Sequence, residues 1–134
     1  DLEAKLDAKY PALTENEIQR ALFAHLAARA WPRVFACHVK NASSDMRGRR
    51  RGVYAGLGVV PGVPDVLIFK AGREPGQCEA FALELKAERG KLSPAQSECM
   101  AQMRHAGVTV AVVWGLDNAI KQLEQWGLVR GRST

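Results

Sequence analysis

The chain alternates between stretches with helical spacing of apolar residues and short apolar runs. The first pattern is helical, at about residues 14–29, where three apolar residues recur every four positions. These are Ile18, Leu22 and Leu26. Thr14 followed by Glu17 is the pattern of a capping box, whose side chains satisfy free backbone N–H groups of the first turn. We therefore predict a helix over 14–29, preceded by a short helical or loose arm at 1–13.

Four short apolar runs, partly β-branched, predict strands. They lie at residues 34–39, 65–69, 79–86 and 108–114. The second run has the composition of a buried strand. The turn sequence Ala71-Gly72-Arg73-Glu74-Pro75-Gly76 separates it from the third run. We therefore expect the second and third strands to pair as a hairpin.

Two more helices follow the third strand. The sequence Ser93-Pro94-Ala95-Gln96 begins one of them, because serine caps, proline suits the first turn and glutamine completes a capping box. This helix is expected to run to about Ala106. Asp117 is expected to cap a last helix that reaches Trp126 and ends at Gly127.

The predicted order is helix, strand, strand, strand, helix, strand, helix, which describes an α/β fold with a mixed sheet flanked by helices. A chain of 134 residues fits one domain, so residues 1–134 are expected to form a single domain. The longest strongly apolar stretch, Val108 to Leu116, is too short to cross a bilayer. No signal peptide is evident, and we expect a cytoplasmic protein without a membrane partner.

The cysteines are odd in number and far apart, which argues against a disulfide framework and a structural zinc site. We predict buried free thiols. The three cysteines are Cys37, Cys78 and Cys99.

Residues 40–62 interrupt the pattern with a polar, glycine-rich segment that we expect to be a long loop. It holds the densest positive cluster of a chain whose net charge is +5. The cluster consists of Arg47, Arg49, Arg50 and Arg51. Such arginines suit contacts with DNA phosphates, although a solvated loop would have the same composition. His38 and Asn41 precede the cluster and are left out of the catalytic set.

The third strand carries the most unusual chemistry in the chain. Side chains alternate across a strand, so Glu84 and Lys86 share one face of a strand that is otherwise apolar. Asp65 begins the neighbouring strand, and hairpin pairing would bring it beside Glu84. A third carboxylate is expected from the first helix. Its helical phase favours Glu15 over Glu17, although the two are close enough to be confused.

Electrostatic repulsion indicates what such a group of carboxylates requires. Two carboxylates about 5 Å apart repel by roughly 3 kcal/mol at an effective dielectric constant of ~20. A divalent cation would offset that repulsion, and hard oxygen ligands prefer Mg²⁺ or Mn²⁺. Each residue alone has an ordinary structural explanation, Asp65 as a turn residue and Glu84 with Lys86 as a surface ion pair. Together they favour a metal-dependent active site.

The ordered set of residues resembles the VRR-NUC family of the PD-(D/E)XK nuclease superfamily, including its small stand-alone phage and bacterial members. The matching residues are Glu15 with Ile18-Gln19, Gly62-Val63-Pro64-Asp65, Glu84-Leu85-Lys86, and Ser93 with Gln96. The resemblance implies a restriction-endonuclease-like fold and a metal held by Asp65, Glu84 and the Leu85 carbonyl. It implies that Lys86 is the catalytic lysine and Glu15 a carboxylate near the metal. Gln96 has two interpretations, as support for the active site or as the cap of its helix.

The sequence and the resemblance together predict an Mg²⁺- or Mn²⁺-dependent DNA endonuclease that selects DNA structure. A homodimer similar to Holliday-junction resolvases, acting in DNA repair on branched DNA, is the first expectation, because two-fold symmetry suits paired cuts. One alternative is a flap, single-strand or restriction-like nuclease. Others are a non-catalytic nucleic-acid-binding module and a plain α/β interaction domain.

Overall fold

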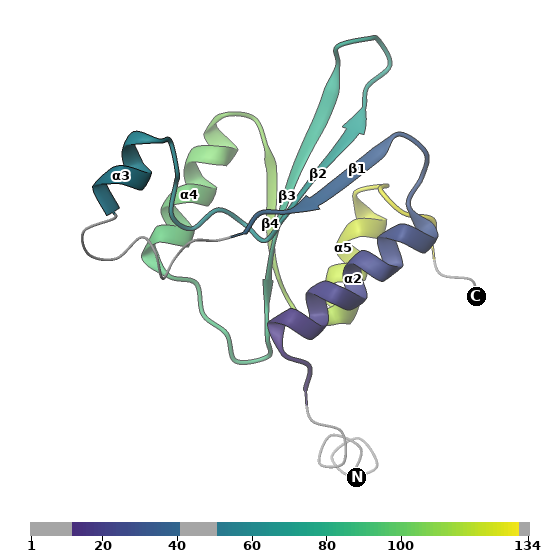
Figure 1. Cartoon of the computed structure of the whole chain (residues 1–134). Helices are drawn as coiled ribbons and strands as arrows, with labels where there is room; N and C mark the ends of the chain where they lie inside the picture. The colour runs from purple at the N-terminus through teal and green to yellow at the C-terminus, as the bar shows by residue number, and fades with distance from the viewer. Residues whose placement is uncertain (1–11, 41–50, 132–134) are drawn as a thin grey trace. The chain divides into compact units, whose positions relative to one another are not determined.

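The computed structural model describes residues 12–40 and 51–131. Its elements in chain order are α2 (Glu15–Arg29), β1 (Val34–His38), α3 (Arg51–Gly56), β2 (Val66–Ala71), β3 (Cys78–Lys86), α4 (Pro94–His105), β4 (Thr109–Trp114) and α5 (Leu116–Gln125). The predicted α/β class is confirmed. The strands form one mixed four-stranded sheet in the order β1-β2-β3-β4 (Figure 1).

The hairpin predicted from the sequence is present and fixes the register of the sheet. β2 pairs with β3 antiparallel, with Val66 opposite Leu83, and β1 pairs with β2 in the same sense. Val66, Ile68, Phe81 and Leu83 are buried, because alternate residues of the two strands face the same way. One face of the hairpin therefore contributes to the core.

Two of the predicted helix starts are confirmed in detail. In α2, the Thr14 side chain accepts from the Glu17 backbone N–H and the Glu17 carboxylate accepts from the Thr14 N–H. In α4, Ser93 and Gln96 form the equivalent box, with a proline in the first turn. Both helices thus begin where side chains replace the missing helical hydrogen bonds.

The segment expected to be one long loop contains a short helix, so that prediction is wrong for residues 51–56. After α3, the Gly58 N–H donates to the Ala55 carbonyl and the Val59 N–H donates to the Tyr54 carbonyl. These two bonds form a Schellman motif, which satisfies carbonyls at the helix end. The glycine content that suggested a loop instead serves to end a helix.

Two smaller predictions also need correction. Asp117 does not cap the last helix, because α5 begins at Leu116 after an N-cap at Gly115, and Asp117 lies inside its first turn. There its negative charge still stabilises the positive end of the helix dipole.

Of the three free cysteines only Cys99 is buried, whereas Cys37 is half-buried and Cys78 exposed. Cys78 is exposed because it lies at the turn end of β3.

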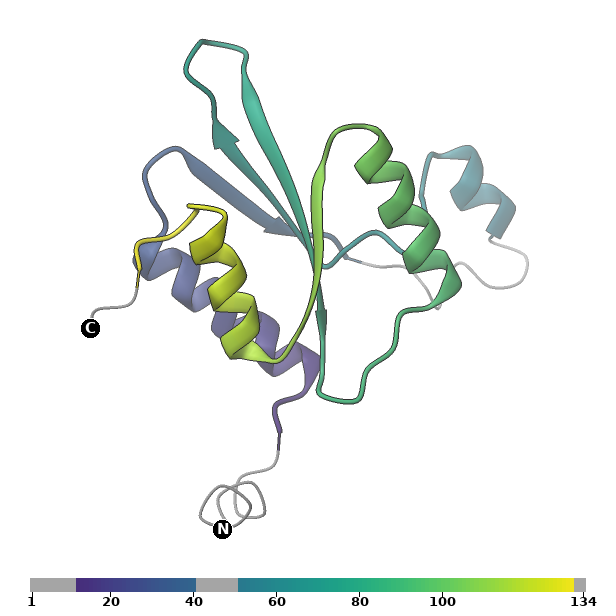
Figure 2. The same ribbon diagram turned by 180° about the vertical axis from the view of Figure 1, so that it is seen from behind.

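By internal contacts the chain divides into two compact units. The first contains the described residues up to Trp31, 85–90 and those from Val113 on, and the second contains residues 32–84 and 91–112. In the first unit, α2 packs beside α5, as both views show (Figures 1 and 2). Its core includes Ile18, Leu22, Leu26, Leu123 and Leu128.

The core of the second unit lies on β2, β3 and α4. Its buried side chains include Val66, Ile68, Phe81, Leu83, Cys99 and Met100. The strand β3 ends two residues into the first unit, since Glu84 belongs to one unit and Leu85 to the other. The prediction of a single domain over 1–134 stays a prediction.

Within the described ranges, no helix has the length and apolar character needed to cross a membrane.

The α2 capping box predicts a pH dependence of stability. The backbone hydrogen bond from Thr14, and next its side chain, lower the pKa of Glu17 below 4.5. A lowered folded-state pKa stabilises the protein above the unfolded pKa, and this contribution is lost as the pH falls through the folded value. We expect Glu17→Gln, which keeps the cap but not the charge, to be less stable than the wild type at neutral pH.

This difference should shrink below about pH 4.5, the unshifted pKa. Urea unfolding followed by circular dichroism at several pH values measures it. A difference that stays constant from neutral to acidic pH would contradict the prediction.

Candidate active site

The hairpin register brings Asp65 beside Glu84 within the second unit. Asp65 directly precedes β2, and continuing the pairing of Val66 with Leu83 by one step sets Asp65 opposite Glu84. The Asp65 backbone N–H donates to Glu84 Oε2 at 3.3 Å. His38 Nδ1–H donates to the Asp65 carbonyl at 2.8 Å, which ties the end of β1 to the same point. The juxtaposition expected from the sequence is therefore present.

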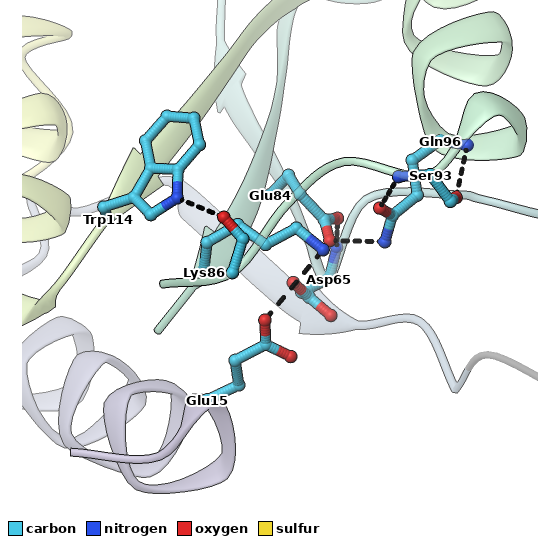
Figure 3. Close-up of polar contacts among 8 residues, drawn as sticks. Glu15, Asp65, Glu84, Lys86, Ser93, Gln96 and Trp114 are labelled. Carbon is cyan, nitrogen blue, oxygen red and sulfur yellow. Dashed lines mark hydrogen bonds and ion pairs between the residues drawn. The ribbon is translucent and has the colours of Figure 1, made fainter. Parts of the chain in front are cut away.

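Gln96 makes the contacts that both interpretations of its sequence position require. Its Oε1 accepts from the Ser93 N–H at 2.9 Å and completes the α4 capping box. Its Nε2 donates to Glu84 Oε1 at 2.9 Å (Figure 3). Each oxygen of Glu84 thus accepts one hydrogen bond, which fixes the carboxylate in place.

Glu84 is only 3% exposed, and its charge influences its surroundings. Burial, followed by the charge of Glu84, raises the pKa of the Cys99 thiol. Both effects disfavour a thiolate on α4, so Cys99 stays a protonated thiol near neutral pH.

Gly62 allows the segment before Asp65 to pass close to the start of α4. Its φ of +82° is one that other residues rarely adopt. A Cβ at this position would lie within 2.6 Å of the Gln96 backbone nitrogen. The sequence Gly62-Val63-Pro64-Asp65 therefore fits against the same helix turn that holds Glu84.

Lys86 lies at the end of β3, within the first unit, and is 6% exposed. Its Nζ is 3.9 Å from Glu15 Oε1, and Figure 3 shows the Glu15 side chain reaching toward it from α2. Glu17 is occupied by the capping box instead. The choice of Glu15 over Glu17 as the carboxylate near the metal stays a prediction, and the contact that the structure shows for Glu15 is with the lysine.

Two residues near Lys86 were missed by the sequence analysis. Gly90 lies so close to the lysine stem that an added Cβ would be 3.1 Å from Lys86 Cδ. Trp114 Nε1–H donates to the Gly90 carbonyl at 2.8 Å and holds this turn in position (Figure 3). The Gly115 N–H donates to the Lys86 carbonyl. No sequence signal links residues this far apart, so only the folded chain reveals them.

Glu84 and Lys86 are the two charged residues among the buried side chains of the described ranges. They point to the same side of β3, since residues two apart on a strand share a face. Buried charges cost stability unless they are paired or hydrogen-bonded. Both charges meet this requirement, Glu84 through its hydrogen bonds and Lys86 through its ion pair with Glu15.

Other predicted site residues have less structural support. Among residues 12–40 and 51–131, no three His, Cys, Asp or Glu side chains gather closely enough to hold a metal ion. The convergence of three carboxylates stays a prediction, and within the second unit the structure brings Asp65 beside the Glu84 carboxylate. Arg47, Arg49, Arg50 and Asn41 lie outside the described residues. Arg51 begins α3, and its side chain is not described.

Comparisons with known proteins find one family. The family model described as the VRR-NUC domain matches residues 9–116. A solved structure, a VRR_NUC domain protein, aligns with a TM-score of 0.63 and 22% identity, covering 86% of this chain and 88% of that chain. At this identity, the likeness shows the fold alone. The search of curated proteins gives no significant match.

Proposed function

Since the chain belongs to the VRR-NUC family of nuclease domains, we propose that it hydrolyses phosphodiester bonds in DNA with the help of a divalent cation. The observation that carries this proposal is the pairing of Asp65 with a buried Glu84 whose two oxygens are each held by a hydrogen bond. A structural ion pair would not need a carboxylate oriented in this way.

The donor set fits Mg²⁺ or Mn²⁺. Asp65 and Glu84 offer carboxylate oxygens, and Leu85, the next residue of β3, offers a backbone carbonyl. All are hard oxygen ligands, which these cations prefer over the nitrogen and sulfur ligands typical of zinc. When bound, such a cation would lower the pKa of a water and neutralise charge on the phosphate.

The residues of the chain have separate roles in this proposal. Gln96 orients Glu84 and is a positioning residue. Lys86 would present a positive charge to the phosphate as negative charge develops on it in the transition state. Glu15 would hold the lysine ammonium in position through the ion pair between Lys86 Nζ and Glu15 Oε1. Burial of Lys86 strengthens its effect, because a charge acts more strongly away from water.

We also propose branched DNA as the substrate and a homodimer as the active form, both from the family resemblance. A two-fold symmetric dimer can make paired cuts in a four-way junction. The four arginines between residues 47 and 51 would contact phosphates without reading sequence.

A substrate and metal panel tests the proposal. Labelled four-way junction, flap and linear duplex are each incubated with Mg²⁺, Mn²⁺ or EDTA, and the products are resolved by gel electrophoresis. We expect cleavage of a branched substrate with either metal and none in EDTA.

Asp65→Asn keeps the shape of the side chain but removes its negative charge, and we expect it to abolish this cleavage. Glu79→Gln, at an exposed position of the same strand as Glu84, is the control and should cut normally. Binding without cutting of any substrate would instead indicate a non-catalytic module.

A further inference from the structure

Two exposed aromatic rings lie next to each other on the hairpin sheet. Phe35 in β1 is directly opposite Phe69 in β2, with ring centroids 6.4 Å apart and 29° between the ring planes. The two residues are 63% and 37% exposed. Large apolar groups gathered on an open surface often mark a binding site.

These rings share a sheet face with the carboxylates. Side chains alternate along β2, so Asp65, Leu67 and Phe69 are on one side while Val66 and Ile68 are on the buried side. Four residues of strand span roughly 13 Å. Between the two ends, Cys37, Leu67 and Ala80 are half-buried, whereas Ala82, opposite Leu67, is fully buried. The accessible strip of this face therefore lies on β1 and β2.

Arg33 stands at the end of this strip in an unfavourable backbone conformation. Its φ of +67° is the one value in the left-handed region among the described residues other than glycine. It follows Pro32 in a turn, at a position that normally takes glycine or asparagine. The Ala71 N–H donates to the Arg33 carbonyl, two residues from each phenylalanine. An exposed arginine held in such a backbone conformation points to a role for its side chain.

From these observations we infer that Phe35, Phe69 and Arg33 form a binding surface for unpaired nucleotides. The rings stack on exposed bases and the guanidinium contacts a phosphate. Bases within a duplex are stacked on each other and offer no free face, so the surface selects single-stranded segments. This inference rests on the proposed function. It favours, among branched substrates, those with an unpaired strand, such as flaps.

The geometry and charge favour a nucleic acid over a second copy of the chain at this surface. Two rings provide much less area than the roughly 800 Å² per partner of a stable protein interface. Arg33 and the net charge of +5 suit a polyanion. The roughly 13 Å to the carboxylates corresponds to about four bases of a stacked strand.

Fluorescence anisotropy in EDTA tests the surface without cleavage. The probes are a fluorescein-labelled oligothymidylate and a labelled duplex. We expect Phe35→Ala and Phe69→Ala to weaken oligothymidylate binding by about five- to 150-fold per ring, as base stacking predicts. Duplex binding should stay near the wild-type value. Phe35→Tyr and Phe69→Tyr keep a stacking ring and should restore binding.

Val53→Ala is the control for apolar surface, since Val53 is also 63% exposed but has no aromatic face. It should bind both probes as the wild type does. An equal loss of oligothymidylate binding in this variant would attribute the effect to general apolar contact and overturn the inference.

Arg33→Gly separates the phosphate contact from stacking. Because glycine suits the turn, the urea midpoint should not fall, while the slope of log affinity against log salt for oligothymidylate should decrease by about 0.7. Lys121→Ala, on exposed α5 surface, removes the same charge and should leave the slope unchanged.

Three further results would overturn the inference: unchanged oligothymidylate binding in the phenylalanine variants, an equal loss for duplex, or conversion of a wild-type dimer to a monomer in sedimentation. The last would assign the rings to an interface between copies. Cleavage of branched DNA by the wild type tests the proposed function separately, so the failure of one is distinct from the failure of the other.

Discussion

Replacing Lys86 by methionine is expected to slow DNA cleavage by about 100- to 1,000-fold while leaving the fold intact. The magnitude is that of removing one electrostatic contact to a transition state. Lys86 is buried, and methionine fills a similar volume. Its partner Glu15 has a side chain 50% exposed, so water can solvate that carboxylate when the ion pair is lost. The urea midpoint should therefore change little.

Single-turnover cleavage with Mn²⁺ measures the loss of rate, and DNA binding in EDTA measures whether affinity is kept. Binding should stay within a few-fold of the wild type, because one phosphate contact is a small part of the affinity. Lys91→Met, which removes an exposed lysine in the segment after β3, should cut normally. Wild-type cleavage by Lys86→Met would show that the lysine is not part of the reaction.

Replacing Gly62 by alanine is expected to destabilise the protein by about 2–5 kcal/mol. Alanine in the left-handed conformation costs about 1–2 kcal/mol, and overpacking adds about 1–3 kcal/mol. The overlap is with the backbone of Ala95 and Gln96, which cannot move aside as a flexible side chain would. Since Gln96 holds Glu84, cleavage should fall as well.

Gly76→Ala is the matched control. Gly76 has the same φ of +82°, but an added Cβ would meet nothing within 4 Å. Gly76→Ala should destabilise the protein only by the cost of the left-handed backbone conformation, about 1–2 kcal/mol, and should leave cleavage unchanged. Urea unfolding gives both values. Equal losses in the two variants would mean that contact with α4 is unimportant.

Much of the fold follows from local signals in the sequence. The two capping boxes mark the starts of α2 and α4, because their side chains compensate for missing helical hydrogen bonds. The hairpin follows from two apolar runs around a turn, and its register brings Asp65 to Glu84. These features depend on residues that are close in the chain or related by a short turn.

The features that the sequence did not predict depend on contacts between residues far apart in the chain, or on local backbone detail that composition does not show. Trp114 and Gly90 are 24 positions apart, and only the folded chain joins them. Apolar composition in β2 suggested a buried strand, yet Phe69 is on the open side of the alternation, beside Phe35 of β1. The helix α3 was hidden because its glycines resemble those of a loop. A positive φ at an arginine has no signature in composition.

The hydrogen bonds of Gln96 limit which amino acids can replace it. Capping boxes accept glutamate or glutamine at the third position, and α2 uses glutamate. In α4 a glutamate at position 96 would still cap the helix. It would, however, replace the amide that donates to Glu84 with a second negative charge. Helix stability alone would permit exchange between these two residues, whereas the neighbouring carboxylate permits only the amide. Among relatives with glutamate at position 84, the residue at position 96 should therefore vary less than the residue at position 17.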